Sequence, residues 1–67
     1  MALKKYYIDT SPLPSEDQRK AIDFIQINAW DHKYIPNSKG CFHCTWEENI
    51  NPSEFPLLAH CIVEELP

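Results

Sequence analysis

The chain contains a single glycine, Gly40, among 67 residues that also include six prolines. Glycine is the residue that most readily adopts the positive φ of a tight turn, so a barrel built from many hairpins needs several glycines. The two Gly-rich phosphate-binding loops, GxGxxG and GxxxxGK, also need more than one. The chain is therefore expected to fold with few tight turns and without a phosphate-binding loop of either kind.

The length allows one domain, spanning residues 1–67, with one hydrophobic core. A chain of this size buries only about 60% of the surface of its unfolded state, so its stability is marginal unless a metal or a disulfide adds to it. Hydrophobic residues make up 43% of the sequence and aromatic residues 12%. Such a composition is typical of a chain that folds rather than of a disordered one.

The first half of the sequence predicts one strand and one helix. Residues 4–9 (KKYYID) are rich in aromatic and β-branched residues and are followed by the proline-containing turn TSPLP. Ser15 then opens the segment SEDQ, which has the Ser-x-x-Gln pattern of a capping box. A helix is therefore expected from Ser15 to about Trp30, with an apolar stripe formed by Ala21, Ile22, Phe24, Ile25 and Ala29.

Residues 41–48 (CFHCTWEE) predict a half-buried strand after a linker over residues 31–40. Successive side chains of a strand point to opposite faces, which places Phe42, Cys44 and Trp46 together on the buried face. The other face of this strand carries Cys41, His43 and Thr45.

Residues 57–66 (LLAHCIVEEL) are apolar on both faces of a strand, so they predict a central strand that pairs with residues 41–47. A helix over residues 54–66 is the alternative, because the same residues also give a helical stripe. The expected fold class is α+β. The domain is expected to be small and single, of β-α-β-β order, with one helix packed on a three-stranded sheet.

Charge is distributed unevenly along the chain. The net charge is −4, but residues 40–67 contain five Glu and no Lys or Arg, a local charge of −5. An acidic half disfavours nucleic acid as a partner, because contacts with phosphates supply most of that affinity. It favours a protein partner with a basic surface. The weaker nucleic-acid alternative would use Tyr34 with the scattered basic residues Lys4, Lys5, Arg19, Lys20, Lys33 and Lys39.

The three cysteines and the start of the chain indicate a cytoplasmic protein. The segment MALKKYYIDTSP has no apolar run after its lysines, so it does not resemble a signal peptide. No segment approaches the roughly 20 apolar residues that span a bilayer, so no membrane association is expected. In the reducing cytoplasm, an odd number of cysteines is expected to be free or metal-bound.

The segment GCFHC allows two interpretations. Cys41 and Cys44 have the Cys-x-x-Cys spacing of a zinc site, which His60 or Cys61 could complete, and a metal would stabilise so short a chain. The preferred interpretation is that Cys44 and Cys61 are small core residues, because both fall on apolar faces of predicted strands. No cofactor is expected under the preferred interpretation, and zinc is the alternative.

Catalysis is not expected. His43 lies near Cys41 on the same strand face, but no third group orients it as a base, and no pair of carboxylates lies among apolar residues. The aromatic residues outnumber those that one helix can cover, so the other sheet face is expected to bind a partner. The sequence therefore predicts a small acidic cytoplasmic protein-interaction module, an inhibitor or modulator, and leaves a homodimer open. Its candidate partner-binding residues are Tyr7, His43, His60, Glu47, Glu48, Glu64 and Glu65.

Overall fold

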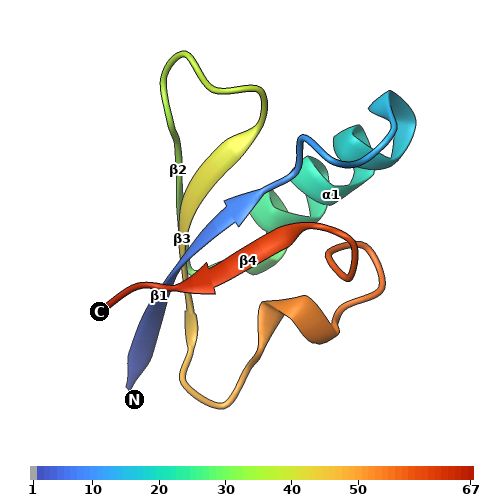
Figure 1. Cartoon of the computed structure of the whole chain (residues 1–67). Helices are drawn as coiled ribbons and strands as arrows, with labels where there is room; N and C mark the ends of the chain where they lie inside the picture. The colour runs from blue at the N-terminus through green and yellow to red at the C-terminus, as the bar shows by residue number, and fades with distance from the viewer. Residues whose placement is uncertain (1) are drawn as a thin grey trace.

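One helix packs on one face of an antiparallel four-stranded sheet (Figure 1). The computed structural model describes residues 2–67, and its arrangement confirms the predicted α+β class and the single domain. The elements in chain order are β1 (Leu3–Asp9), α1 (Ser15–Asn28), β2 (Asp31–Tyr34), β3 (Cys41–Glu47), the short 3₁₀ helix η1 (Pro52–Glu54) and β4 (Ile62–Glu65).

The strands lie in the order β2-β3-β1-β4, so β1 and β3 are central and β2 and β4 form the edges. The predicted three strands were one too few, because β2 lies in the segment that was expected to be a linker. All four residues of β2 are exposed. A strand that buries neither face shows no alternation of apolar and polar residues, so its sequence gives no strand signal.

The C-terminal strand differs from the prediction in length and position. It spans only Ile62–Glu65, lies at an edge and pairs with β1, whereas a longer central strand paired with β3 was expected. The alternative helix over residues 54–66 is not formed either, because residues 56–60 make turns. Leu58 lies within these turns and is completely buried, so this segment covers the core instead of extending the sheet.

The helix starts where predicted, but the expected capping box is absent. Pro14 occupies the N-cap and no side chain caps the helix, because Ser15 is already its first helical residue. The Gln18 side chain instead donates to the Thr10 hydroxyl and, at 2.6 Å, to the Lys39 carbonyl. The helix ends at Asn28, before the predicted Trp30, because the chain turns there to enter β2.

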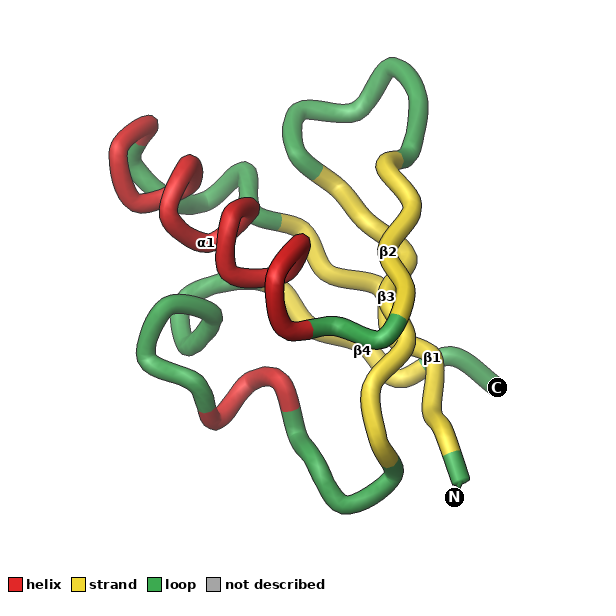
Figure 2. The backbone as a smooth tube through the Cα atoms, turned by 180° about the vertical axis from the view of Figure 1, so that it is seen from behind, coloured by secondary structure: helices red, strands yellow, loops and turns green. Residues whose placement is uncertain are grey.

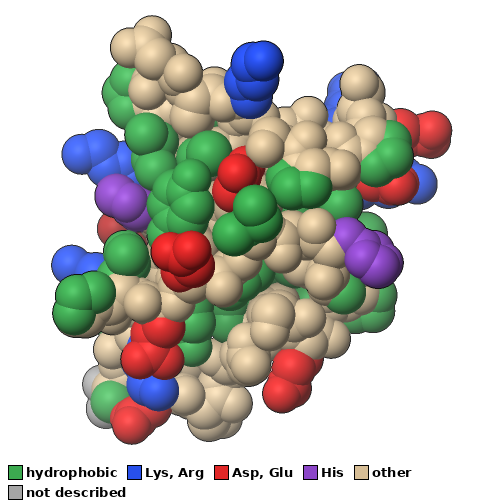
Figure 3. Space-filling view, in the orientation of Figure 1, with side chains coloured by type: hydrophobic (Ala, Val, Ile, Leu, Met, Phe, Trp, Pro, Cys, Tyr) green, Lys and Arg blue, Asp and Glu red, His purple; other side chains and the backbone are tan. Residues whose placement is uncertain are grey.

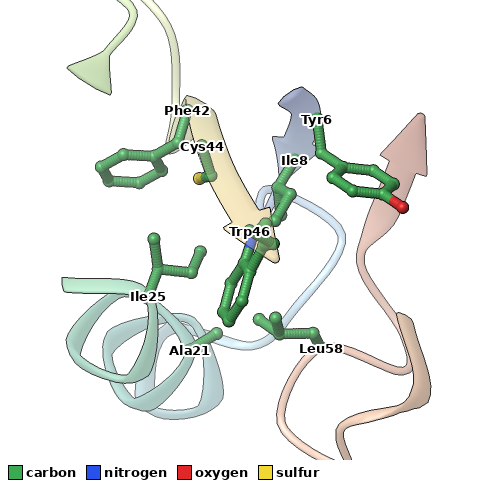
Figure 4. Packing of buried hydrophobic residues seen from close by; sticks show 8 residues of the cluster. All are labelled: Tyr6, Ile8, Ala21, Ile25, Phe42, Cys44, Trp46 and Leu58. Carbon is green, nitrogen blue, oxygen red and sulfur yellow. The ribbon is translucent and has the colours of Figure 1, made fainter. Parts of the chain in front are cut away.

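The core forms where α1 crosses β1 and β3. Figure 4 shows Ala21 and Ile25 of α1 facing the Trp46 ring, with Leu58 on the other side of that ring. The predicted alternation in β3 is confirmed, since its buried residues are Phe42, Cys44 and Trp46. Tyr6 and Ile8 complete the core from β1, and Phe24 and Phe55 stack or tilt against Trp46 with ring centroids 6.4 and 5.6 Å away.

The only glycine of the chain joins the end of β1 to the start of β3. Gly40 has a φ of 112°, a value that residues with a Cβ rarely adopt, and a Cβ at this position would collide with Thr10 and Gln18. Its carbonyl accepts hydrogen bonds from both the backbone N–H and the hydroxyl of the buried Thr10, at 3.0 and 2.7 Å. This contact fixes the loop between β2 and β3 against the start of the helix.

The long connections extend from opposite ends of the sheet. Figures 1 and 2, which view the molecule from opposite sides, place the β2–β3 loop at one end and the segment containing η1 at the other. The side chains of this segment that pack on the core, Ile50, Phe55 and Leu58, do so on the helix side. The other sheet face is therefore left without a covering element among residues 2–67.

The small core makes stability depend on single residues of α1. Ile25 is fully buried, so Ile25→Ala should cost about 2–5 kcal/mol, most of the stability that so small a domain has. The variant is expected to be largely unfolded at room temperature when monitored by circular dichroism. Ile27 is 80% exposed, so Ile27→Ala is the matched control and should melt as the wild type does. Equal melting of both variants would contradict this assignment of the buried helix face.

Candidate protein-binding face

The sheet face that points away from α1 is named here the open face. Its side chains follow from strand alternation, because the neighbours of each buried residue in β1 and β3 point outward. The antiparallel register then places one outward residue of each strand beside those of its neighbours. The open face consists of Leu3, Lys5, Tyr7, Asp9, Asp31, Lys33, Cys41, His43, Thr45, Glu47, Ile62 and Glu64.

One row of side chains crosses the middle of the open face on all four strands. Lys33 of β2 lies opposite His43 of β3, His43 lies opposite Tyr7 of β1, and Tyr7 lies opposite Glu64 of β4. The rings of Tyr7 and His43 meet edge to face, with centroids 6.1 Å apart. A cation, two aromatic rings and a carboxylate therefore follow one another across the sheet.

Two hollows flank this central row, each of about 210 Å³. Both are bordered by Lys33 and His43. The first is also lined by Lys5, Asp31, Cys44, Thr45 and Leu66, and the second by Tyr34, Ile35 and Pro36. The open face is therefore hollowed in two places that Lys33 and His43 border.

The structure brings only some of the predicted binding residues together. Tyr7 and His43 are in contact at the centre of the open face, and Glu64 lies opposite Tyr7. His60 does not belong to a strand; it is exposed in the turns that precede β4. Glu47 is on the open face, but at its far end, opposite Leu3.

The remaining predicted acids lie off the open face. Glu48 is exposed in the turn after β3. Glu65 lies opposite the buried Tyr6, on the helix side of β4, and forms a 3.4 Å ion pair with Lys4. β1 separates β3, which carries Glu47, from β4, which carries Glu64 and Glu65, so the acids of residues 40–67 do not form one continuous acidic surface. Figure 3 shows acidic side chains at several places on this side of the molecule, and a basic side chain lies between two of those at the lower left.

Several residues of the open face were not predicted from the sequence. Asp31 and Lys33 were missed because β2 was taken for a linker, and Leu66 because β4 was expected to pair with β3. Leu66 donates its backbone N–H to the Lys5 carbonyl at 2.8 Å, which brings it beside the first hollow. Only the order of charges in DHKY, with opposite signs two residues apart, marked β2 in the sequence.

The cysteines occupy three different environments, and all of them are free. Cys41 lies on the open face, where its sulfur accepts a hydrogen bond from the Tyr7 hydroxyl at 3.2 Å. This bond is the main reason that the pKa of Tyr7 is raised to about 12. Cys44 is buried on the helix side, and burial raises its thiol pKa to about 12. Burial also raises the pKa of the half-buried Cys61, to about 11.

The geometry does not fit the zinc alternative. Cys41 and Cys44 point to opposite faces of β3, so their sulfurs cannot bind one tetrahedral ion without disrupting the strand. Among residues 2–67, no group of three or more His, Cys, Asp and Glu side chains is placed to hold a metal.

A chelator should therefore leave the fold unchanged. Excess EDTA is expected not to move the melting temperature, and native mass spectrometry of the protein purified with zinc present should show no unit stoichiometry of metal. A protein held by structural zinc loses folding energy directly when the metal is removed. A large drop in melting temperature with EDTA would contradict the geometry described for Cys41 and Cys44.

Stability should fall in alkaline solution. The thiols of Cys44 and Cys61 ordinarily ionise near 9.0 and the Tyr7 hydroxyl near 10.0, so each pKa is higher in the folded state than in the unfolded state. A raised pKa adds stability below the unfolded value, and that contribution is lost as the pH rises toward the folded value. The free energy of unfolding, measured with urea, should not depend on these groups up to about pH 8. It should decrease between about pH 9 and 12.

Cys44→Ala tests this assignment. The variant is less stable at every pH because of the cavity it creates, but its free energy of unfolding should fall less steeply above pH 9 than that of the wild type. An identical slope in both proteins would show that the buried thiol does not contribute.

Comparisons of the chain with protein-family models, curated proteins and solved structures find no match in any of the three. Across residues 2–67, none of the helices has both the length and the apolar composition needed to cross a membrane.

Proposed function

We propose that the protein is a protein-binding module that inhibits or modulates its partner by occupying the partner's surface, without catalysis. The observation that carries this proposal is the edge-to-face ring pair of Tyr7 and His43, which lies at the centre of a sheet face that no element of residues 2–67 covers. Aromatic residues at the centre of a surface, surrounded by polar ones, are typical binding hot spots.

The charges of the open face favour a partner with a basic surface. Lys5 and Lys33 are outnumbered by the acidic residues of this face, Asp9, Asp31, Glu47 and Glu64. Asp9 accepts a hydrogen bond from the Ser11 N–H at 2.9 Å, which lowers the pKa of its carboxyl and keeps it charged. Complementary charges on a partner would speed the encounter and orient it.

The chemistry of the central residues supports binding rather than catalysis. The Tyr7 hydroxyl has a pKa of about 12, so it stays protonated near neutral pH and can donate but not act as a base. The Cys41 thiol is engaged by this hydroxyl instead of being paired with an oriented histidine. The exposed side chains of Leu3 and Ile62 offer apolar contact area beside the polar groups.

The proposed compartment is the cytoplasm. Three free cysteines, one of them on the surface next to Tyr7, would persist as thiols in a reducing environment. An oxidising compartment would expose Cys41 to intermolecular disulfide formation.

Charge reversal on the open face should slow association with the partner. A pull-down from the native cytoplasm identifies the partner, and binding kinetics are then measured at two salt concentrations. Glu47→Lys and Glu64→Lys are expected to reduce the association rate and its dependence on salt, because they remove attraction over a Debye length of about 8–10 Å. Glu54→Lys in η1 makes the same charge change away from the open face and is the matched control.

Truncating the ring at the centre should act on dissociation instead. Tyr7→Ala is expected to raise the dissociation rate by roughly 30-fold, the effect of losing about 2 kcal/mol at a hot spot. His60→Ala, an exposed histidine outside the open face, serves as the control. An acidic partner, a salt-independent rate, or equal effects of the paired variants would each contradict the proposal.

A further inference from the structure

Among residues 2–67, no strand pairs with the outer edge of β2. β2 is the terminal strand of the sheet, and its four residues, Asp31–Tyr34, are all exposed. The two residues with large exposed rings at its ends are Trp30, 58% exposed, and Tyr34, 47% exposed. Such an edge presents unpaired N–H and C=O groups that can form hydrogen bonds with another strand.

The hydrogen-bond pattern identifies which backbone groups point outward. The Ile35 N–H donates to the Cys41 carbonyl at 2.9 Å, which extends the pairing of β2 with β3 by one residue. Bonding alternates along an antiparallel strand, so Lys33 and Asp31 also direct their backbone groups toward β3. His32 and Tyr34 therefore direct theirs away from the sheet.

We propose that β2 pairs with β2 of a second copy of the chain, antiparallel and centred on His32. Each His32 then exchanges both of its backbone hydrogen bonds with the second copy's His32. In this register Asp31 lies directly opposite the second copy's Lys33, and Lys33 lies opposite the second copy's Asp31. The symmetry of the segment W-D-H-K-Y about its histidine makes the edge complementary to itself.

The two neighbouring two-fold registers bring like charges together. Outward backbone groups must meet outward groups, so the register can only move by steps that keep His32 and Tyr34 in the bonded positions. One such step places Lys33 opposite the second copy's Lys33, and the step in the other direction places Asp31 opposite the second copy's Asp31. Like charges directly opposite each other destabilise a strand pair, so the register centred on His32 is selected.

The chain around β2 limits the pairing to this short segment. The Trp30 N–H is already bonded to the Thr45 carbonyl at 2.9 Å, and Pro36 has no N–H to donate. The other edge of the sheet is poorly suited to self-pairing, because β4 carries the adjacent acids Glu64 and Glu65. So small an interface falls below about 1,200 Å², the range of weak and transient complexes.

Charge swapping tests the register. Sedimentation equilibrium of the wild type from about 10 µM to about 1 mM should show a reversible monomer–dimer equilibrium, as expected for a small interface. Asp31→Lys and Lys33→Asp should each lower the association constant by about tenfold or more, because each single change creates two pairs of like charges. The double variant carrying both changes should restore dimerisation.

Proline and alanine at the centre test the backbone bonds separately from the charges. His32→Pro removes an N–H that points away from β3, so the chain should fold as before but remain monomeric. His32→Ala keeps the N–H and should still dimerise. Circular dichroism and the melting temperature verify that both variants are folded.

Four results would overturn the proposal. The first is a monomer throughout the concentration range, and the second is an assembly larger than a dimer. The third is a dimer that the single charge variants do not weaken, or that the double variant does not restore. The fourth is a folded His32→Pro variant that dimerises like the wild type. None of these measurements involves the partner of the open face, so they leave the proposed function to its own test.

Discussion

The register between β1 and β3 is the constraint on which the other features of the molecule depend. It is anchored at one end by the buried Thr10, which donates two hydrogen bonds to the Gly40 carbonyl and so holds Asp9 opposite Cys41. A slip of one residue would move every side chain of one strand to the other face. Tyr7 would then enter the core, and Ile8 would face water. Gly40 makes this contact possible, because its positive φ and missing Cβ leave room for the side chains of Thr10 and Gln18.

With this register, the core can be small because Trp46, its largest residue, contacts side chains of both the helix and the segment after β3. Trp46 of β3 contacts the rings of Phe24 in α1 and Phe55 after η1, and it lies between α1 and Leu58 (Figure 4). The indole N–H is buried and has no hydrogen-bond partner among residues 2–67, which costs free energy. The ring area that it buries offsets this cost, since aromatic side chains contribute most to the energy of a small core.

The sequence predicted those parts of the fold in which burial leaves a periodic pattern. The helix start, its apolar stripe and the alternation of Phe42, Cys44 and Trp46 were predicted because each buries one face against the other layer. β2 was missed because it buries nothing. The length and the pairing partner of β4 were predicted wrongly for a different reason. Leu58 was assigned to the strand, but it lies in the turns before β4 and is buried in the core.

The candidate site was predicted only in part, for the same physical reason. Tyr7 and His43 were identified because strand alternation fixes their face, whereas their contact with each other depends on a register that the sequence does not state. The acids were expected to act together because residues 40–67 contain five Glu and no Lys or Arg. Their separation by β1 and the ion pair of Glu65 with Lys4 arise only from the strand order.

The proposed pairing through β2 would change how the open face meets a partner. A two-fold axis that passes between the two paired His32 residues, perpendicular to the sheet, would continue the sheet from one copy into the next and keep both open faces on the same side. Lys33 would lie at the contact between the two β2 strands, and it also belongs to the central row with His43 and Tyr7. A partner with two basic sites could therefore engage both copies at once, and the second contact would form at the high effective concentration set by the first. Weak pairing between copies and weak binding by each face would then combine into firm binding without any additional contact.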